Sequence, residues 1–342
     1  MMERMRIEED RPLAALTTLR VGGAARLAVT CESDEDILTA LAFAAKENLP
    51  WTVLGQGSNI LASDEGFAGV VLLMRSTHYE FKEEDDRVLL VADAGASWDA
   101  LVSESVSRGL WGLENLAGIP GTVGAAPVQN IGAYGAELGD TLAWVEVIDV
   151  RTREMSRLPA AACGLGYRDS RFKREPELVI VRVAVLLSKH GEPRTSYKDL
   201  VARSEAGEDL STPKAIASAV RTVRSVKFPD LREYGTAGSF FKNPVVSPSA
   251  YEALQAQYPD LPCFETPLGI KIPLAWILDH VLQLRSFALG PVHLFERQPL
   301  VLVTDTGATA HDVELLANEV TVRVKDATGI LIEREVRSLP QK

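Results

Sequence analysis

The chain has 342 residues, of which 46% are hydrophobic and 24% are charged, so it can bury a sizeable core and is neither disordered nor fibrous. At roughly 100–200 residues per domain, this length allows two or three domains. The formal net charge of −11 opposes binding to nucleic acid or to an anionic membrane, because both require a basic surface. We therefore expect neither partner, and an anionic ligand must be held in an enclosed site by local cations or backbone N–H groups.

Cysteine usage and the first residues predict a cytoplasmic protein. Cys31, Cys163 and Cys263 lie far apart and form no CxxC pair, which argues against a disulfide framework. The N-terminal sequence MMERMRIEEDR lacks the apolar core of a secretory signal. The uncharged stretch from Leu116 to Ala136 is long enough to span a bilayer, but its glycines and prolines exclude a membrane helix. We expect a buried or ligand-lining glycine loop there.

The first 190 residues predict several apolar strands and few long helices. Ser33, followed by acids and an apolar face, predicts a capped helix over 33–46. A second helix is expected over 98–109, with Gly109 as its C-terminal cap. Apolar runs predict strands at 51–55, 70–74, 88–93, 142–150 and 178–187. This order lacks the βαβ repeat of a doubly wound fold and indicates an α+β class.

The last third of the chain has a different texture. Thr212 and Pro213 predict the start of a helix that reaches residue 227. Prolines become frequent beyond that helix, so we place a domain boundary near 228. Further helices are expected around 274–282 and over 310–329.

The segment ILIEREV predicts a terminal strand over 330–336. Its alternation would place Glu333 and Glu335 on one face, where an exposed pair of carboxylates is the alternative to a functional pair. None of the five histidines forms HExxH or sits beside a cysteine at ligand spacing. We therefore expect no structural metal.

Two glycine-rich segments are candidates for binding a dinucleotide. GQGSN at 55–59 follows a predicted strand, but it lacks the third glycine of GxGxxG, and an ordinary turn is the alternative. In AGIPGTVGAAPVQNIGAYG at 117–135, small residues let backbone N–H groups approach a ligand, while Gln129, Asn130 and Tyr134 offer polar contacts. A tightly packed core loop is the alternative for this segment.

Two polar motifs are further candidates for the site. YRDSRFKR at 167–174 gathers four cations in an acidic chain, which indicates either an anion site or a solvated basic edge. GSFFKNP at 238–244 contains a serine but is not the GxSxG of a hydrolase, so a turn serine is the alternative to a chemical role.

Taken together, these segments resemble the UDP-N-acetylenolpyruvoylglucosamine reductases, the MurB family of flavoproteins in peptidoglycan precursor synthesis. The resemblance runs almost end to end, and its most specific parts are the long glycine block and GSFFKNP. The matching blocks are TTLRVGGAAR at 17–26, LGQGSNIL at 54–61, GLENLAGIPGTVGAAPVQNIGAYGAEL at 112–138, CGLGYRDSRFK at 163–173, VRSVKFPD at 223–230, GTAGSFFKNP at 235–244, RQPLVLV at 297–303 and IEREV at 332–336.

The resemblance implies an α+β protein with an FAD-binding region of the PCMH or vanillyl-alcohol-oxidase type. That region would cover 1–227 in two lobes that divide near residue 75, and 330–342 would return to it. A smaller α+β substrate-binding domain would occupy 228–329. The implied reaction uses non-covalent FAD and NADPH to reduce UDP-N-acetylglucosamine enolpyruvate to UDP-N-acetylmuramate for the bacterial cell wall.

The resemblance also implies roles for particular residues. Arg168 matches the catalytic cation, Ser239 the proton donor and Glu335 the third catalytic position, which would have to be protonated. Lys227 is the candidate activator of Ser239. The expected cofactor-binding residues are Gly55, Gly57, Ser58, Asn59, Gly118, Ile119, Pro120, Gly121, Gly124, Asn130, Gly132, Ala133 and Tyr134. The expected substrate-binding residues are Tyr167, Tyr197, Lys227, Asn243 and Gln298, with Arg224 and Lys242 as further candidates for neutralising phosphate.

The sequence departs from the family pattern at Phe228, Leu231 and Thr236 and over 282–298. The insertion 188–212 is the candidate for a lid. Two rival functions stay open: a flavin-dependent oxidase acting on a small alcohol, and a non-catalytic sugar-nucleotide-binding protein. The first would leave GSFFKNP and IEREV without a role, and the intact catalytic trio argues against the second.

Overall fold

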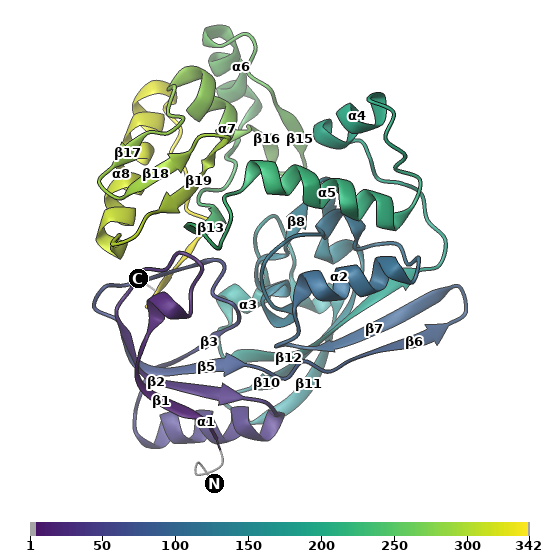
Figure 1. Ribbon diagram of the computed structural model, residues 1–342, viewed down its shortest axis with the longest axis vertical. Helices are drawn as coiled ribbons and strands as arrows, with labels where there is room; N and C mark the ends of the chain where they lie inside the picture. The colour runs from purple at the N-terminus through teal and green to yellow at the C-terminus, as the bar shows by residue number, and fades with distance from the viewer. Residues whose placement is uncertain (1–4, 341–342) are drawn as a thin grey trace. The chain divides into compact units, whose positions relative to one another are not determined.

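The computed structural model describes residues 5–340, which form two compact units (Figure 1). The first unit contains the described residues up to Arg11 together with Ala25–Gln56 and Ala68–Ser225. The second unit contains Pro12–Ala24, Gly57–Phe67 and the described chain from Val226 onward. Two short early segments therefore fold with the C-terminal part of the chain. The outermost bounds of the predicted regions, residues 1–4 and 341–342, lie outside the described residues.

The first sheet of the first unit has four strands in the order β1-β2-β5-β3. These strands are β1 (Ile7–Pro12), β2 (Ala24–Cys31), β5 (Phe67–Met74) and β3 (Trp51–Leu54). Strands β3 and β5 run parallel, with Trp51 in register with Val70. Both strands confirm predictions made from apolar runs at 51–55 and 70–74.

Helix α1 (Asp34–Lys46) packs on this sheet, since its buried Ile37 and Leu41 share one apolar cluster with Val70. Its start is the predicted capped one. The Ser33 hydroxyl accepts the Asp36 N–H at 3.2 Å, and the Asp36 carboxylate accepts the Ser33 N–H at 3.0 Å. This reciprocal pair satisfies two N–H groups that the helix leaves open.

The second sheet of the first unit has five strands in the order β11-β10-β12-β7-β6, with antiparallel neighbours throughout. These strands are β11 (Glu154–Pro159), β10 (Leu142–Asp149), β12 (Leu178–Ser188), β7 (Arg87–Asp93) and β6 (Tyr79–Glu84). Three of them confirm the strands predicted at 88–93, 142–150 and 178–187. Strand β12 is central, and its long apolar run is buried on both faces of the sheet.

Helices α2 (Trp98–Ser107) and α5 (Pro213–Lys227) contribute to the core of this sheet, with Val102 and Val220 fully buried in it. Gly109 follows α2 with a φ of +72°, as expected for a residue that ends a helix in the left-handed conformation. The remaining helices of this unit are short: α3 (Arg171–Arg174) and α4 (Lys198–Glu205).

The second unit contains a four-stranded sheet in the order β13-β19-β18-β17 and a three-stranded sheet in the order β14-β16-β15. The strands are β13 (Gly235–Ser239), β19 (Gln298–Thr304), β18 (Val292–Phe295), β17 (Ala288–Leu289), β14 (Val245–Val246), β16 (Gly269–Lys271) and β15 (Phe264–Thr266). Its helices are α6 (Pro248–Gln257), α7 (Leu274–Trp276) and α8 (Ala310–Thr328). The apolar face of α8 is buried through Val313, Leu316 and Val320, and Gly329 ends the helix at a φ of +71°, as predicted.

One helix prediction for this unit is confirmed and one strand prediction is wrong. The helix expected around 274–282 is present, as one turn of α7 that continues as a π-helical turn at Ile277–Val281. The strand expected over 330–336 is wrong, because ILIEREV makes only one isolated bridge, from Arg334 to Phe241. The chain then leaves that neighbour, and β20 (Arg337–Leu339) pairs in parallel with β4 (Ile60–Ala62).

The apolar side chains that suggested a longer strand are buried, as the alternation predicts: Ile330, Ile332 and Val336. The backbone partners change within a few residues, however, from Phe240 at Glu335 to Asn59 at Arg337. A continuous ladder cannot form across such a change of partner. In the described part of the chain, no helix has both the length and the apolar character that crossing a membrane requires.

Candidate active site

The turn GQGSN joins β3 to β4, in the position that the sequence order predicts. Gly57 lies in the left-handed region with a φ of +62°, and a Cβ there would come within 2.3 Å of the Leu16 carbonyl oxygen. Its own carbonyl accepts the Thr18 N–H at 3.2 Å. Only glycine fits this point without moving the backbone, so the turn is built against the segment that contains Leu16 and Thr18.

The turn also contacts the glycine block. The Gln56 side-chain oxygen accepts the Gly121 N–H at 3.0 Å. A Cβ on Gly55 would lie 2.3 Å from the Thr122 hydroxyl oxygen, which shows how closely the two backbones approach. The two segments that the sequence predicts to bind a dinucleotide are therefore adjacent, although Gln56 and Gly121 are 65 residues apart.

The glycine block folds as short 3-10 turns followed by a hairpin. The turns are Glu114–Leu116, Val123–Ala125 and Pro127–Gln129, and the hairpin strands are β8 (Gly132–Ala133) and β9 (Ala136–Glu137). A Cβ on Gly124 would lie 2.6 Å from that of Ala94. This part of the segment is therefore a tightly packed core loop, which was the alternative to a ligand-binding role. Gly135 is different: it has a φ of +83°, and nothing lies within 4 Å of a Cβ placed there. This end of the block borders open space.

Asn130 uses its side chain to hold the block together. Its amide donates to the Glu137 carboxylate at 2.7 Å and to the Gly166 carbonyl at 3.2 Å, and its amide oxygen accepts the Gly139 N–H at 2.9 Å. Asn130 is only 2% exposed and has a φ of +46°. The side chain is thus a scaffold for the block, and a direct contact between Asn130 and a cofactor stays a prediction.

Side chains from two helices hydrogen-bond to the backbone N–H and to the backbone carbonyl of Gly118. Asp99 in the first turn of α2 accepts the Gly118 N–H at 2.6 Å and also pairs with Arg221 at 2.8 Å. Arg224 of α5 donates to the Gly118 carbonyl at 2.9 Å, and burial lowers the pKa of this arginine. Asp99 is not among the residues predicted from the sequence, where its one signal is its place in the first turn of the predicted helix 98–109.

Arg168 lies beside the hairpin of the glycine block. Its guanidinium donates to the Gly132 carbonyl at 2.9 Å and lies 5.6 Å from the centre of the Tyr167 ring. A Cβ on Gly132 would approach a guanidinium nitrogen of Arg168 to 3.1 Å, so a glycine there leaves room for the arginine. The backbone carbonyl of Arg168 accepts a hydrogen bond from the Lys173 ammonium at 2.6 Å. Arg168 and Tyr167 are therefore positioned against a predicted cofactor segment.

The other arginines of the YRDSRFKR motif fit the alternative of a solvated basic edge. Arg171 pairs with Glu175 at 2.8 Å, and Arg174 pairs with Asp169. Carboxylates already neutralise both charges, so the motif offers Arg168 and Lys173 as its candidate cations for an anion.

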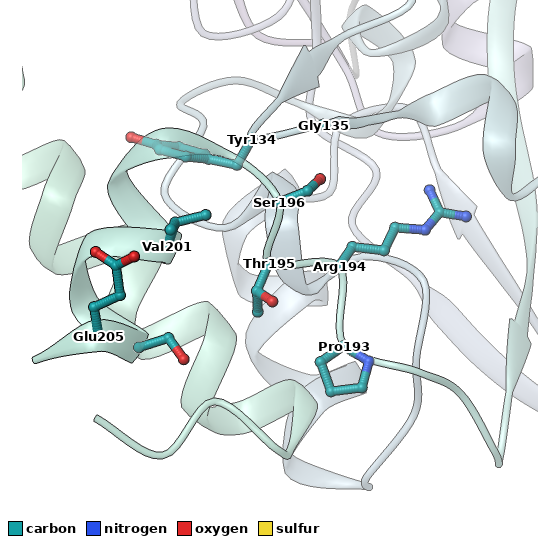
Figure 2. A pocket seen from close by; sticks show the side chains of 9 residues that line it. Tyr134, Gly135, Pro193, Arg194, Thr195, Ser196, Val201 and Glu205 are labelled. Carbon is teal, nitrogen blue, oxygen red and sulfur yellow. The ribbon is translucent and has the colours of Figure 1, made fainter. Parts of the chain in front are cut away.

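A pocket of about 590 Å³ lies where the glycine block meets the 188–212 insertion (Figure 2). Its lining residues are Tyr134, Gly135, Pro193, Arg194, Thr195, Ser196, Val201, Ser204 and Glu205. The ring of Tyr134 meets that of Tyr197 edge to face, with 5.1 Å between centroids. Tyr134 is 8% exposed, and burial raises its pKa to about 12, so the phenol stays protonated at neutral pH. Tyr197 is 43% exposed, which leaves it accessible to a ligand.

In the second unit, Ser239 ends strand β13 and follows Gly238, which has a φ of +75°. The register between β13 and β19 shifts between Thr236 and Ser239, so the serine leaves the regular ladder. Thr236, a departure from the family pattern, donates to the Leu302 carbonyl at 2.7 Å and accepts the Gly238 N–H at 3.1 Å. The threonine therefore supports the irregular backbone that presents Ser239, which is half-buried.

Glu335 lies on the chain segment next to that of Ser239. Its N–H donates to the Phe240 carbonyl at 2.8 Å, and its carbonyl accepts the Asn59 side-chain amide at 3.2 Å. Three segments far apart in the sequence thus converge within the second unit: the end of the GQGSN turn, GSFFKNP and IEREV. Two predicted catalytic residues, Ser239 and Glu335, belong to this convergence, whereas Arg168 belongs to the first unit.

The predicted substrate residues of the second unit occupy defined positions. The Asn243 side-chain oxygen accepts the Leu274 N–H at 2.9 Å at the start of α7. Gln298 begins β19, and Lys227 is the last residue of α5. Lys242 pairs with Glu333 at 2.8 Å, so its charge is already neutralised. The Glu333 side chain is 73% exposed, which agrees with the alternative that this carboxylate lies on an exposed face.

The residues present fit a flavin dinucleotide. Such a ligand needs close backbone approach and fixed positive charge near its diphosphate. The left-handed Gly135, with nothing within 4 Å of a Cβ placed on it, leaves room for the first requirement. Arg224, a buried cation beside Gly118, supplies the second.

Comparison with known proteins supports the same combination of parts. Residues 25–156 match the family model of an FAD binding domain, and residues 230–339 match that of the UDP-N-acetylenolpyruvoylglucosamine reductase C-terminal domain. These matches, with the mixed helices and strands, confirm the expected α+β fold with an FAD-binding region of the PCMH type.

Similar relatives carry one name, UDP-N-acetylenolpyruvoylglucosamine reductase. That of Photobacterium profundum is 40% identical over 336 residues, which cover 97% of this chain and 96% of the relative. That of Escherichia coli K12 is 38% identical over 312 residues, which cover 90% of both. The crystal structure of the Thermus caldophilus enzyme aligns with a TM-score of 0.69 at 26% identity, over 98% of this chain and 99% of that chain. The chain therefore belongs to the UDP-N-acetylenolpyruvoylglucosamine reductase (MurB) family of FAD-dependent oxidoreductases.

Proposed function

We propose that this protein reduces UDP-N-acetylglucosamine enolpyruvate to UDP-N-acetylmuramate with NADPH, in the synthesis of peptidoglycan precursors. The observation that carries the proposal is the hydrogen bond from the Glu335 N–H to the Phe240 carbonyl at 2.8 Å. It sets one proposed catalytic residue beside the segment that holds another, Ser239. The membership of the chain in the reductase family gives this arrangement its chemical meaning.

When bound, FAD supplies the redox chemistry, because it can take up a hydride from NADPH and release it to the C3 carbon of the enolpyruvyl group. Negative charge then develops across C2 and the substrate carboxylate, and a fixed cation beside those atoms lowers the barrier. We assign this role to Arg168. Its bond to the Gly132 carbonyl and its contact with Tyr167 support the assignment, because both fix the direction of the guanidinium.

The second half of the reaction needs a proton at C2, which we assign to the Ser239 hydroxyl. Addition of a hydride at C3 and a proton at C2 saturates the double bond and balances the reaction. A serine is a weak acid, and we assign Lys227 to stabilise the alkoxide that remains after transfer. Glu335, in its protonated form, would donate a hydrogen bond to the enol or to the substrate carboxylate.

The binding residues follow the same division. We assign FAD to the GQGSN turn and to the glycine block, from Gly118 to Tyr134. The residues assigned to the substrate are Tyr167, Tyr197, Lys227, Asn243 and Gln298. Residues 1–227 would form the flavin region, and 228–329 the substrate domain. The segment 330–342 would serve the flavin region through the pairing of β20 with β4, which directly follows the GQGSN turn. We place the reaction in the cytoplasm, the compartment that supplies its two nucleotide substrates.

An anaerobic experiment tests this function. The purified flavoprotein is first bleached with NADPH, and UDP-N-acetylglucosamine enolpyruvate is then added without oxygen. We expect the oxidised flavin spectrum to return rapidly and UDP-N-acetylmuramate to form in equal amount.

The rival functions give different results in the same experiment. A flavin that bleaches with NADPH but returns only when air enters would favour the oxidase. A flavin that NADPH does not reduce would favour a sugar-nucleotide-binding protein without turnover.

A further inference from the structure

The first turn of helix α2 hydrogen-bonds to the glycine block at three points. The Trp98 N–H donates to the Gly121 carbonyl and the Trp98 indole N–H donates to the Leu116 carbonyl, both at 3.1 Å. Between these two points, the Asp99 carboxylate accepts the Gly118 N–H at 2.6 Å. Two consecutive residues of one helix thus hold a stretch of the block that includes the first glycine assigned to FAD.

Helix α5 orients the Asp99 carboxylate. Arg221 donates to its two oxygens, at 2.8 and 3.4 Å, and also to the Ser103 hydroxyl at 2.7 Å. Arg224, three residues further along α5, donates to the Gly118 carbonyl at 2.9 Å. The two peptide groups that flank Gly118 are therefore held by different helices, one through Asp99 and the other through Arg224.

This arrangement decides which N–H groups the segment can offer to a ligand. The Gly118 N–H is occupied by the carboxylate of α2, and the Gly121 N–H is occupied by the Gln56 side-chain oxygen at 3.0 Å. Pro120 has no N–H, and no acceptor among the described residues engages the N–H of Ile119. A change in the backbone at Gly118 would therefore alter both the path of the segment and the set of N–H groups that it presents.

Exposure separates a positioning role for Asp99 from a stabilising one. The side chains of Asp99 and Arg221 are 38% and 33% exposed, and an ion pair so open to solvent contributes little to stability. The bond to Gly118, in contrast, is charge-assisted and acts on the backbone of the block itself. We propose that Asp99 is a positioning residue, which fixes Gly118 and thereby holds the glycine block in its cofactor-binding conformation before FAD binds. The inference rests on the proposed cofactor site.

The test compares Asp99→Ala with Asp99→Asn, because asparagine keeps an oxygen that can accept the Gly118 N–H but loses the negative charge. Flavin fluorescence on dilution of the holoenzyme gives the dissociation constant for FAD. Asp99→Ala should raise this constant about 10-fold, because the released block must then be ordered when FAD binds. Asp99→Asn should bring it back to within about threefold of the wild type.

Glu104→Ala is the matched control. It removes another carboxylate of α2, which pairs with Arg108 at 2.7 Å and, among the described residues, bonds to no part of the glycine block. This control should leave the dissociation constant within about twofold of the wild type. Melting temperatures are also recorded over a series of FAD concentrations. Asp99→Ala should gain less from added FAD than the wild type or Glu104→Ala, a difference that a general loss of stability would not produce.

Three results would overturn the inference: an unchanged FAD dissociation constant in Asp99→Ala, an equal rise in Glu104→Ala, and no rescue by Asp99→Asn. If Asp99→Ala does not fold, Arg221→Met decides, because it keeps the carboxylate but removes the cation that orients it. A rise of about threefold in the dissociation constant would then support the inference, and an unchanged constant would overturn it. The proposed function is judged separately, by reoxidation of the wild-type flavin with substrate, so either can fail without the other.

Discussion

Arg168 shows how much local structure supports one side chain that we propose to be catalytic. Its φ of +52° lies in the left-handed region, which costs a non-glycine residue about 1–3 kcal/mol. The conformation is held by the Lys173 ammonium on its carbonyl and by the Gly132 carbonyl on its guanidinium. The family match at 163–173 predicted the residue, but the strain and its two supports became visible only in the folded chain.

Ser239→Ala should separate the two halves of the reaction. NADPH-driven reduction of the flavin should stay within about twofold of wild type, since no proton from this hydroxyl is needed there. Reoxidation by the substrate should slow by about 10²- to 10⁴-fold, the usual contribution of general acid catalysis. Anaerobic stopped-flow absorbance measures both rates.

The control for this variant is Ser249→Ala, which removes an exposed hydroxyl of α6 in the same unit. It should leave both half-reactions unchanged. Equal slowing of both halves in Ser239→Ala would remove the serine from the role of proton donor.

At the scale of elements, the long helix α8 has both ends defined by sequence-local signals. Thr309 and Asp312 form a reciprocal cap, with the Thr309 hydroxyl accepting the Asp312 N–H at 3.1 Å and the Asp312 carboxylate accepting the Thr309 N–H at 2.9 Å. The distant Asp64 adds a further cap by accepting the Ala310 and His311 N–H groups at 2.8 and 2.9 Å. The local cap could be read from the sequence, whereas the Asp64 contact depends on the fold.

Thr309→Ala should lower the free energy of unfolding of this unit by about 1 kcal/mol at pH 7, the usual cost of losing an N-cap. The Thr309 hydroxyl and N–H hold the pKa of Asp312 below its ordinary value of 3.8. That contribution is complete above this value and is lost as the pH falls through the lowered pKa. Urea unfolding at pH 7 and at pH 3 should therefore show a smaller difference at pH 3.

The matched control for the cap is Thr321→Ala, inside the same helix, where the hydroxyl only bonds back to the Ala317 carbonyl. It should change stability by less than about 0.5 kcal/mol, because alanine is the better helix former. An equal loss in both variants would mean that the effect of Thr309→Ala does not come from capping.

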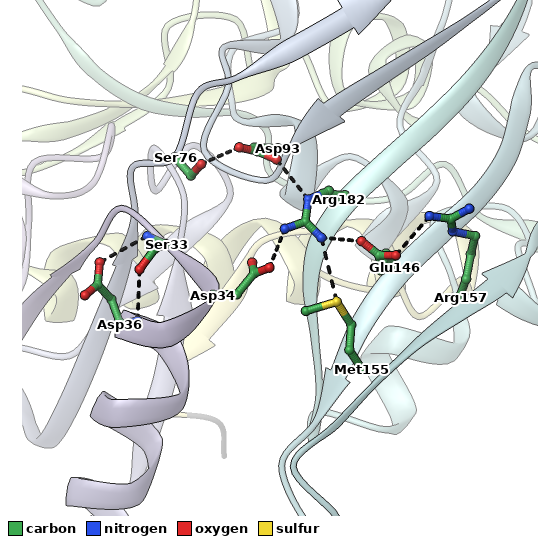
Figure 3. Close-up of polar contacts among 9 residues, drawn as sticks. All are labelled: Ser33, Asp34, Asp36, Ser76, Asp93, Glu146, Met155, Arg157 and Arg182. Carbon is green, nitrogen blue, oxygen red and sulfur yellow. Dashed lines mark hydrogen bonds and ion pairs between the residues drawn. The ribbon is translucent and has the colours of Figure 1, made fainter. Parts of the chain in front are cut away.

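At the scale of the whole molecule, Arg182 ties separate layers of the first unit together (Figure 3). It projects from the central strand β12 and pairs with Asp34 at the start of α1, with Glu146 of β10, and with Asp93 of β7 at 3.2 Å. These partners come from the helix on the first sheet and from both strands that flank β12 in the second sheet. One guanidinium therefore bonds to three carboxylates that would otherwise repel one another more strongly.

Arg182→Met should lower the free energy of unfolding by about 2–3 kcal/mol, somewhat less than for a fully buried ion pair because the side chain is 29% exposed. Arg157→Met is the control, because Arg157 pairs with a single carboxylate of the described residues, Glu146, stacks on the Trp144 ring, and has a side chain that is 56% exposed. It should cost less than about 1 kcal/mol. Urea unfolding in saturating FAD measures both, and equal costs would contradict the linking role of Arg182.

Elements with local signals can be predicted from the sequence, because caps, helix-ending glycines and apolar runs act within a few residues. Such signals predicted α1, α8 and five strands of the first unit, β3, β5, β7, β10 and β12, and the motif blocks identified the family. The tertiary structure decided which distant segments meet. Thr236 donates to Thr18 at 2.9 Å and Arg337 to Asn59 at 3.1 Å, and these contacts group early segments with the C-terminal unit.

The terminal segment shows the physical reason for this division. The alternation of ILIEREV records which side chains are buried, but the identity of the backbone partner depends on chain more than 90 residues away for Arg334 and about 280 residues away for Arg337. The same holds for charge: an arginine in the sequence does not reveal whether a carboxylate will reach it. Only the folded chain shows that Arg334 pairs with Glu314, whereas no carboxylate of the described residues pairs with Arg337.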